Sequence, residues 1–506
     1  MKIIGQNGRR RIGAATLVVM LAGSLPASAT VIVGAMVVDG TGAPRRAAAV
    51  RVERGRIVAI GRLEPRAGEP VIDGRGLVLA PGFIDTHSHH DIGLDTDRGA
   101  TAAVAQGITT IVVGQDGTGA HPIATFFDTL RKRPAAVNVA SYAGHNVLRK
   151  IAMGDGAARV ATAQEQARMV TMLDRDMAAG ALGLATGLEY DPGRNASPDE
   201  VLLLAKAAAR HGGRYISHLR SEDRDLWAAV DEIIAIGRAT RGPVQISHAK
   251  LAMSGLWGQA GTLLAKLDAA RRSGIDITID VYPYTYWQSQ LALLWPDRRF
   301  TDRAQADYAL RHLVRPDGLK LVSYPPDPGL AGLTLAEIAR RRGRDVTSVL
   351  IELAQADAVA GGQARVVAEA MAERDVAALM AWPHANICSD GLLSDAHPRG
   401  AGAFARVLRV YVRERRALTL EAAIHKMTGL AARHMGLRGR GTIRVGAPAD
   451  LVLFDPATVA DRATVENPAA LAVGIRSVWV NGRQVWDGSR ITRSFPGRVL
   501  RRGTAA

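Results

Sequence analysis

The sequence predicts an α/β protein: a (β/α)8 TIM-type barrel with a small β-sandwich domain built from the N- and C-terminal segments. Two observations lead to this prediction. In the middle of the 506-residue chain, short apolar runs alternate with long Ala-, Leu- and Arg-rich stretches of helical period, which is the pattern of repeated βα units. Both ends are instead rich in Val and Ile in short alternating runs broken by Gly and Pro, which is typical of antiparallel strands.

Eight apolar runs fit the strands of the barrel. They span 77–87, 108–114, 137–144, 182–187, 214–218, 243–248, 276–282 and 385–389. Helical segments such as 198–211, 226–240 and 263–273 separate them. Eight βα units are the content of a closed parallel barrel, which typically needs about 250 residues or more. The stretch from about 290 to 341 is too long for a simple connection, so we expect it to be an insertion over the barrel mouth.

The domain boundaries follow from these patterns. We expect residues 30–78 to form the first part of the sandwich and residues 79–437 to form the barrel. Residues 438–506 would supply the second part of the sandwich and the C-terminal tail. In that last segment, Asn481-Gly482 between two apolar runs predicts a hairpin turn.

Residues 1–29 have the pattern of a signal peptide. Basic residues including Arg9, Arg10 and Arg11 precede an apolar run, and Ala27-Ser28-Ala29 is a small-x-small cleavage site. The run is too short to span a bilayer. We therefore expect a periplasmic or secreted protein, cleaved near Ala29, with no stable membrane anchor afterwards. The pattern leaves open whether export follows the general or the twin-arginine route.

Composition narrows the class of protein. A hydrophobic fraction of 47% excludes a disordered chain, and the single cysteine excludes an intramolecular disulfide. The formal net charge of +16 comes from scattered arginines, without a dense basic block in the body of the chain. We therefore expect no nucleic-acid partner. The oligomeric state stays open.

Histidines and an aspartate stand where the predicted strands end. His87 and His89 close the first barrel strand, and the alternation of a strand puts both on one face. His218 and His248 close two later strands, and Asp390 follows the eighth. The carboxyl ends of the strands meet at one mouth of such a barrel. Imidazole and carboxylate ligands suit Zn²⁺ or a similar divalent ion, so the sequence predicts a metal centre there.

The order of these residues resembles that of the amidohydrolase superfamily, and longer stretches are similar to the N-acyl-D-amino-acid deacylases (D-aminoacylases). The similarity covers nearly all of the chain after residue 29. The matching stretches include PGFIDTHSHHD (81–91), GITTIVVG (107–114), GALGLATGLEY (180–190), ISHLRSE (216–222), PVQISHAK (243–250), DVYPYT (280–285), SDG (389–391) and HPRGAGAFARVL (397–408). The resemblance implies that one or two zinc ions assist hydrolysis of the amide bond of N-acyl-D-amino acids, yielding a carboxylate and a free D-amino acid.

The chain departs from the family at the turn after the second strand. The family commonly has Asn-Cys-Gly there, whereas this chain has Gln115-Asp116-Gly117. Asp116 is a candidate ligand, and a carboxylate is harder than a thiolate, which would relax the preference for zinc. Many amidohydrolases bridge two metals with a carboxylated lysine after the fourth strand, but 180–190 contains no lysine. Glu189 could supply a carboxylate instead.

Candidate roles follow for the remaining residues. We expect Asp390 to accept the proton of the attacking water and return it to the leaving amine, as general base and acid. Tyr190 could stabilise the oxyanion. Lys250 and Arg220 lie two residues past His248 and His218, so strand alternation would aim them at the substrate's α-carboxylate. Tyr282 is a further candidate pocket residue.

Two alternatives stay open at this point. A barrel of the same fold could act on another amide, such as a D-dipeptide, a cyclic amide or imide, or a bulky N-acyl amino acid. A catalytically inactive barrel could serve as a binding or scaffold module, although a scaffold has no physical need for four histidines and Asp390 at strand ends.

Overall fold

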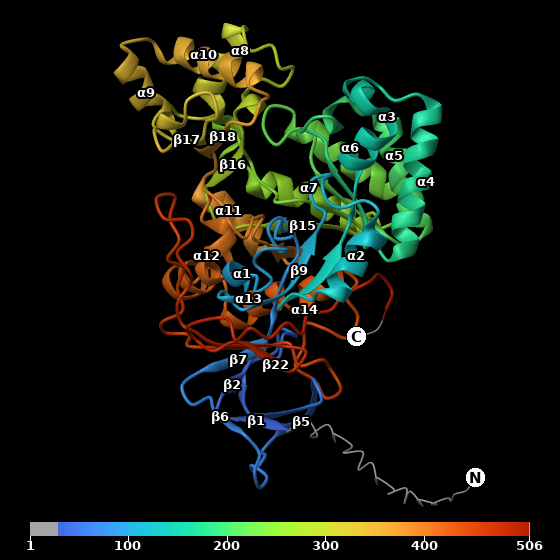
Figure 1. Ribbon diagram of the computed structural model, residues 1–506, viewed down its shortest axis with the longest axis vertical. Coiled ribbons are helices and arrows are strands. Elements are labelled where there is room, and N and C mark those ends of the chain that lie inside the picture. The colour runs from blue at the N-terminus through green and yellow to red at the C-terminus, as the bar shows by residue number, and fades with distance from the viewer. Residues whose placement is uncertain (1–28, 505–506) are drawn as a thin grey trace, which may run out of the picture.

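The computed structural model describes residues 29–504 and confirms the predicted fold class (Figure 1). The expected signal peptide lies outside the described residues except for Ala29. Within the described part of the chain, no helix combines the length and apolarity needed to cross a bilayer.

Eight parallel strand positions make the barrel, and the third of them is divided into two short strands. In chain order they are β8 (Phe83–Asp85), β9 (Ile108–Val113), β10 (Asn138–Ser141) with β11 (Ala143–Gly144), β12 (Gly183–Gly187), β13 (Arg214–His218), β14 (Val244–Ile246), β15 (Ile277–Val281) and β19 (Ala385–Ile387). Neighbouring strands pair in parallel from β8 to β10 and from β11 to β19. Backbone hydrogen bonds of 2.9 Å from Asp390 N to His87 O and from His89 N to Gly391 O join the ends of β19 and β8.

Helices surround these strands. They are α1 (Thr101–Val104), α2 (Ile123–Lys132), α3 (His145–Met153), α4 (Ala163–Ala179), α5 (Pro198–Arg210), α6 (Leu226–Thr240), α7 (Ala260–Arg272), α11 (Glu373–Ala381), α12 (Arg399–Arg406), α13 (Leu420–Met427) and α14 (Gly429–His434). Side-chain N-caps begin α4, α5 and α13. For example, the Ser197 side chain accepts a hydrogen bond from Glu200 N, and Pro198 occupies the first turn of α5.

The two ends of the chain meet in the sandwich, as the sequence predicted. One sheet has the order β5-β4-β1-β6 and the other β22-β21-β20-β7-β2-β3. Their bounds are β1 (Thr30–Val33), β2 (Met36–Val37), β3 (Arg46–Ala47), β4 (Ala49–Glu53), β5 (Arg56–Gly61), β6 (Val71–Asp73), β7 (Val78–Pro81), β20 (Leu451–Phe454), β21 (Ile475–Val480) and β22 (Arg483–Trp486). Antiparallel pairing of β20 with β7 joins the ends, over a shared core that includes Ile32, Leu79 and Leu453.

The run 77–87, expected as one barrel strand, is divided between the two domains. β7 belongs to the sandwich sheet and only β8 to the barrel. Gly82 lies between them, where a Cβ would come within 2.2 Å of the Thr109 side chain. Both halves are apolar because both are buried, so hydrophobicity alone does not mark the boundary.

A separate subdomain projects from the barrel between β15 and α11 (Figure 1). It contains β16 (Tyr286–Gln290), β17 (Leu319–Ser323), β18 (Arg365–Glu369), α8 (Arg303–Tyr308), α9 (Leu335–Arg342) and α10 (Val346–Val359). The strands form an antiparallel sheet of order β16-β18-β17 over a core of its own, which includes Leu294 and Leu350. This subdomain runs beyond the expected 290–341, because β18 returns to pair with β16 only at residues 365–369.

Candidate metal centre and active site

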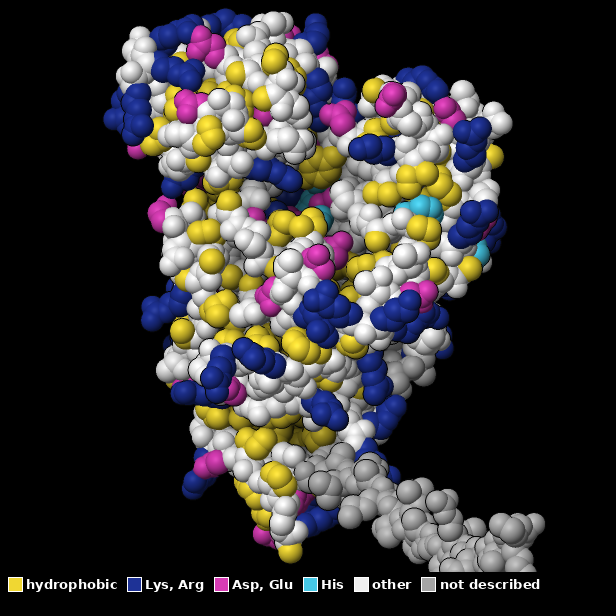
Figure 2. Space-filling model, viewed as in Figure 1, with side chains coloured by type: hydrophobic (Ala, Val, Ile, Leu, Met, Phe, Trp, Pro, Cys, Tyr) yellow, Lys and Arg dark blue, Asp and Glu magenta, His cyan; other side chains and the backbone are white. Residues whose placement is uncertain are grey.

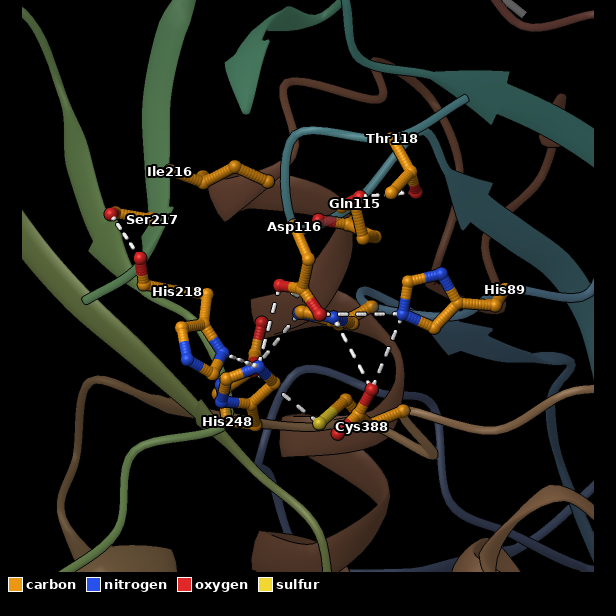
Figure 3. Close-up of polar contacts among 12 residues, drawn as sticks. His89, Gln115, Asp116, Thr118, Ile216, Ser217, His218, His248 and Cys388 are labelled. Atoms are coloured by element: carbon orange, nitrogen blue, oxygen red, sulfur yellow. Dashed lines mark hydrogen bonds and ion pairs between the residues drawn. The ribbon is translucent and has the colours of Figure 1, made fainter. Parts of the chain in front are cut away.

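The candidate ligands come from the carboxyl ends of five different barrel strands and converge at the mouth (Figure 3). Each lies at or just after the last residue of its strand. They are His87 and His89 after β8, Asp116 after β9, His218 at the end of β13, His248 after β14 and Asp390 after β19.

Four of these side chains form one tight group. His87 Nε2 lies 3.4 Å from Asp116 Oδ1 and 3.5 Å from Asp390 Oδ1. His89 Nε2 lies 3.4 Å from Asp116 Oδ2 and 3.5 Å from Asp390 Oδ1. One donor atom from each residue lies within 4.8 Å of all the others, which is the spacing of ligands around a single ion.

A second group shares Asp116. His248 Nε2 lies 3.3 Å from Asp116 Oδ1 and 3.1 Å from His218 Nδ1. The Asp116 carboxylate therefore stands between two imidazole pairs, one from β8 and one from β13 and β14. On the outer side, His218 Nε2 lies 2.9 Å from Glu189 Oε2, so Glu189 belongs to the site but contacts only His218 among the four histidines.

Three of the converging residues have left-handed backbone conformations. The φ angles are 53° for Asp116, 34° for His248 and 51° for Asp390. Such angles cost free energy in residues other than glycine and cluster at functional sites, where the surrounding structure imposes them. Here they turn the chain just past a strand end, so that each side chain points back across the mouth.

A buried aspartate below the site supports this geometry. Asp280, on β15, accepts hydrogen bonds from the His248 backbone N–H and the Gln245 side chain. The Cys388 thiol also donates to Asp280, over 3.4 Å. Cys388 is fully buried, and through Asp280 it helps to position His248 indirectly.

The electrostatics of the site fit a divalent cation. Burial and the Lys250 ammonium disfavour a charged His248 imidazole, but carboxylates including Asp116 outweigh them and raise the pKa of His248 to about 10. Burial is likewise outweighed at His89, whose pKa rises to about 10 beside Asp116 and Asp390. The carboxylates thus favour positive charge at this position, which a bound cation would supply. Among the described residues, His87 Nε2 and Asp116 Oδ1 are also buried without a hydrogen-bond partner.

Arg399 holds Asp390 as a carboxylate. Arg399 is the first residue of α12, and its guanidinium donates a hydrogen bond to Asp390 Oδ2. Burial would raise the pKa of Asp390, but Arg399 and the nearby histidines outweigh burial and hold that pKa well below its usual range. The pairing depends on close packing, because a Cβ on Gly391 would lie 2.3 Å from Gly400 Cα.

A cavity opens beside the ligand groups and contains three of the four predicted substrate residues. Tyr190, Lys250 and Tyr282 all line it. Lys250 Nζ lies 2.7 Å from both Glu222 oxygens. Tyr282 is 3% exposed, and its hydroxyl has no hydrogen-bond partner among the described residues. The Tyr190 ring packs 4.3 Å from that of His218, centroid to centroid.

Arg220 does not reach this cavity, which corrects the prediction from strand alternation. Its guanidinium pairs with Glu232 on α6 at 2.8 and 3.0 Å and donates to Ala196 O. The strand ends at His218, so the two-residue alternation no longer governs the direction of a side chain at position 220.

Sequence reasoning missed Arg399 and Glu222 as site residues. Both stand in stretches already noted for other reasons: Arg399 lies in HPRGAGAFARVL, and Glu222 ends ISHLRSE. Neither lies at a strand end, so strand periodicity carries no signal for them. The signal that could have found them is their place inside stretches that already match the resembled family.

A metal-binding mouth of this kind, on a barrel joined to a terminal sandwich, defines an amidohydrolase. The amidohydrolase family model matches residues 375–486. N-acyl-D-glutamate deacylase of Alcaligenes xylosoxydans xylosoxydans is 39% identical and covers 93% of this chain and 96% of its own length. D-aminoacylase of the same organism is 38% identical, covering 93% and 97%.

A solved structure agrees with these relatives. N-acyl-D-glutamate deacylase from Bordetella bronchiseptica, complexed with zinc and a phosphonate mimic of the tetrahedral intermediate, superposes with a TM-score of 0.84. It is 37% identical, and the match covers 93% of this chain and 99% of that one. The chain therefore belongs to the N-acyl-D-amino-acid deacylase (D-aminoacylase) family of the amidohydrolases.

Proposed function

We propose that this chain hydrolyses the amide bond of N-acyl-D-amino acids to a carboxylate and a free D-amino acid, with zinc at the barrel mouth. The observation that carries the proposal is the convergence of two imidazole pairs on Asp116, next to a cavity lined by Lys250 and Arg399. The relatives add the substrate class, because those named above are N-acyl-D-glutamate deacylase and D-aminoacylase.

The ligand groups would serve two zinc ions that share Asp116. The first group is His87, His89, Asp116 and Asp390, and the second is Asp116, His218 and His248. When bound, zinc lowers the pKa of a coordinated water toward ~7 and polarises a carbonyl oxygen.

Protein side chains would carry the proton and the charge. Asp390 is ionised before reaction because Arg399 stabilises the carboxylate, so it can accept a proton from the attacking water. Asp390 then delivers that proton to the amide nitrogen as the C–N bond breaks, and the amine leaves neutral. Burial and the surrounding carboxylates hold the pKa of Tyr190 well above its usual value, so its hydroxyl keeps its proton and can donate to the developing oxyanion.

Two cations would bind the α-carboxylate of the substrate. Lys250 and Arg399 both lie near the ring of Tyr282, with Nζ at 5.7 Å and Cζ at 5.1 Å from its centroid. The unpartnered Tyr282 hydroxyl stands in the same cavity. A carboxylate entering there would find charge and a hydrogen-bond donor together.

The proposal is tested with a panel of amides. The zinc-loaded protein is offered N-acetyl-D- and N-acetyl-L-amino acids, D-dipeptides and a cyclic imide, and the released amine is quantified. Release from the N-acetyl-D substrates above all others supports the proposal. Faster release from a dipeptide or a cyclic imide, or no release from any amide by protein that holds zinc, would overturn it.

We also propose that residues 1–29 direct export to the periplasm or medium, which the basic, apolar and small-residue pattern of that segment supports. N-terminal sequencing of the protein from fractionated cells tests this: a mature chain that begins at Thr30 outside the cytoplasm supports it, and an intact Met1 in the cytoplasm contradicts it.

A further inference from the structure

We propose that a pocket lined by arginines, at the end of the barrel opposite the metal centre, binds a phosphate group. The arginine pocket is defined as Arg438, Arg440, Arg498 and Arg501. Its ligand would be inorganic phosphate or the phosphomonoester group of a larger molecule. The inference goes beyond the deacylase function proposed above and does not depend on it. It is carried by the place of the pocket in the fold, its unbalanced charge and one buried guanidinium group.

The pocket lies where the last described segment of the chain crosses the amino-terminal ends of barrel strands. Val499 pairs with Val139, the second residue of β10. Arg502 N donates to Gly180 O, just before β12 begins. Leu437, three residues past the end of α14, also lines the pocket. The metal ligands stand at the carboxyl ends of the strands, so the two sites lie at opposite ends of the barrel.

The base of the pocket is apolar and firmly packed. Leu437 and Leu500 line it and are 6% and 9% exposed. Both belong to the same buried cluster as Ile84 of β8 and Val112 of β9. A backbone hydrogen bond of 2.8 Å from Leu500 N to Val139 O fixes the segment against β10. The arginines are therefore attached to backbone that is held in place before a ligand arrives, which limits the entropy lost on binding.

The protein does not balance the positive charge of this pocket. The residues that line it include no aspartate or glutamate. Within residues 29–504, Arg438, Arg498 and Arg501 form no ion pair with a carboxylate. Figure 2 shows Lys and Arg side chains gathered along this edge of the barrel, near the place where Figure 1 marks the C-terminus. Like charges held together in a concave surface repel one another, and a bound anion would remove that cost.

Arg440 adds a buried donor that lacks an acceptor. This residue is 7% exposed. Its guanidinium donates to Asp450 and, over 3.2 Å, to Asn481 Oδ1, but its Nε is buried without a hydrogen-bond partner among the described residues. An unsatisfied buried N–H costs free energy and calls for an explanation such as a missing ligand. Because Arg440 lines the pocket, a bound anion is the group that would bring an acceptor to it.

The donors of the pocket fit a phosphate group better than a carboxylate. A guanidinium presents parallel N–H groups that match two oxygens of one phosphate. A phosphomonoester offers three such oxygens and a charge of about −1.5 to −2 at pH 7, whereas a carboxylate offers two oxygens and a single charge. Three unpaired arginines, with the Thr504 hydroxyl beside them, therefore match the phosphate in both charge and number of donors.

The first test is calorimetric titration of the full chain with sodium phosphate, at an ionic strength held constant with chloride. Phosphate also binds zinc, so the titration is made both with zinc-loaded protein and with protein stripped of zinc. We expect one phosphate per chain to bind the stripped protein saturably. Binding that appears only with zinc would place the phosphate at the metal centre and overturn the inference, as would the absence of saturable binding.

The second test removes single charges from the pocket. Arg438→Gln and Arg498→Gln are compared with Arg493→Gln, which removes the same charge from an exposed residue outside the pocket. Each pocket variant should weaken phosphate binding by about 10-fold or more, because a charge-assisted hydrogen bond is lost. The control should stay within about twofold of wild type. Equal weakening in all three would show that only net charge matters and would overturn the inference.

Folding of the variants is checked by their melting temperatures. Both replaced pocket arginines are exposed, and either variant alone suffices for the comparison with the control. The wild-type protein gives a further readout. Its melting temperature, measured without zinc, should rise with phosphate more than with chloride at equal ionic strength, because a ligand that binds only the folded state stabilises it. Equal melting temperatures in the two salts would contradict a phosphate site.

Vesicles distinguish the two sources of the phosphate group. The probes are phosphatidylcholine vesicles with and without phosphatidic acid, and bound protein is measured by sedimentation. Binding that needs phosphatidic acid and falls about 10-fold in Arg438→Gln would support a lipid phosphate as the ligand. Binding of inorganic phosphate without vesicle binding would support a soluble phosphate compound. If neither inorganic phosphate nor the phosphatidic acid vesicles bind, the arginine pocket is not a phosphate site.

Discussion

Asp116 and His248 meet across the barrel mouth, with Asp116 Oδ1 3.3 Å from His248 Nε2, and both residues have left-handed backbone conformations. The second oxygen of the same carboxylate lies 3.4 Å from His89 Nε2. The Asp116 side chain therefore contacts both imidazole pairs. Asp116, His248 and Asp390 all have positive φ angles, which indicates that the surrounding fold imposes this arrangement. This shared carboxylate is the observation on which we propose that two metal positions are coupled.

Zinc stoichiometry should reveal this sharing. We expect wild-type protein to bind two zinc ions, His89→Ala to lose affinity at one position and His218→Ala at the other. Asp116→Ala should weaken both positions, because each loses a ligand. Calorimetric titration with elemental analysis after dialysis measures the effect. Wild-type stoichiometry and affinity in Asp116→Ala would show that the carboxylate holds neither ion.

Asp390→Asn should abolish turnover while keeping the fold. The amide is nearly the same size and keeps one oxygen, but it cannot accept the proton of water, so we expect kcat to fall by about 100- to 10,000-fold. Circular dichroism controls for folding and should match wild type, and kcat is compared at equal zinc content because Asp390 also belongs to the first ligand group. Near-normal kcat in the variant would remove Asp390 from the proton path.

Lys250 and Arg220 form a matched pair of cations, one inside the cavity and one outside. Lys250→Met should raise KM by about 10-fold or more, since the α-carboxylate loses a cation. Arg220→Met should leave KM within about twofold, because Arg220 pairs with Glu232 instead. Steady-state kinetics measure KM for both variants, and their melting temperatures show whether they fold. The reverse order of effects would restore the prediction made from strand alternation.

Lys426 gives the fold a pH dependence that is separate from the metal centre. Lys426 is 5% exposed, and its ammonium donates to Trp382 O and Ala385 O. Burial lowers its pKa from 10.5 to about 8. The folded protein therefore holds the proton less tightly than the unfolded chain. This costs about 3 kcal/mol of stability below pH 8, and the cost disappears as the pH rises toward 10.5.

The comparison of wild type with Lys426→Met measures this effect. The melting temperature of wild type should rise relative to that of the variant as the pH increases from 7.5 to 10. Other titrating groups are common to both proteins and cancel in the difference. A difference that stays constant over this range would show that Lys426 is not desolvated.

The sequence predicts a site residue correctly where that residue lies at or just after the end of a barrel strand. His87, His89, His218, His248 and Asp390 were predicted because strand ends in a barrel converge. Arg220 was placed wrongly because strand alternation was extended past His218, the last residue of β13.

Residues placed by tertiary packing had no such signal. Arg399 reaches Asp390 only because Gly391 and Gly400 allow the α12 terminus to approach the strand end. The extent of the insertion was also underestimated, since its last strand returns late in the sequence to complete a sheet. Local periodicity shows that elements exist, whereas their partners depend on contacts between distant segments.

The most direct test of the central claim uses one pair of enantiomers and one metal. N-acetyl-D-leucine and N-acetyl-L-leucine are each incubated with protein stripped by chelator and with the same protein after zinc is restored, and free leucine is measured. We predict leucine release from the D enantiomer alone and only after zinc is restored. Equal release from both enantiomers, or release by the stripped protein at the rate of the zinc-loaded one, would contradict a metal-dependent D-amino-acid deacylase.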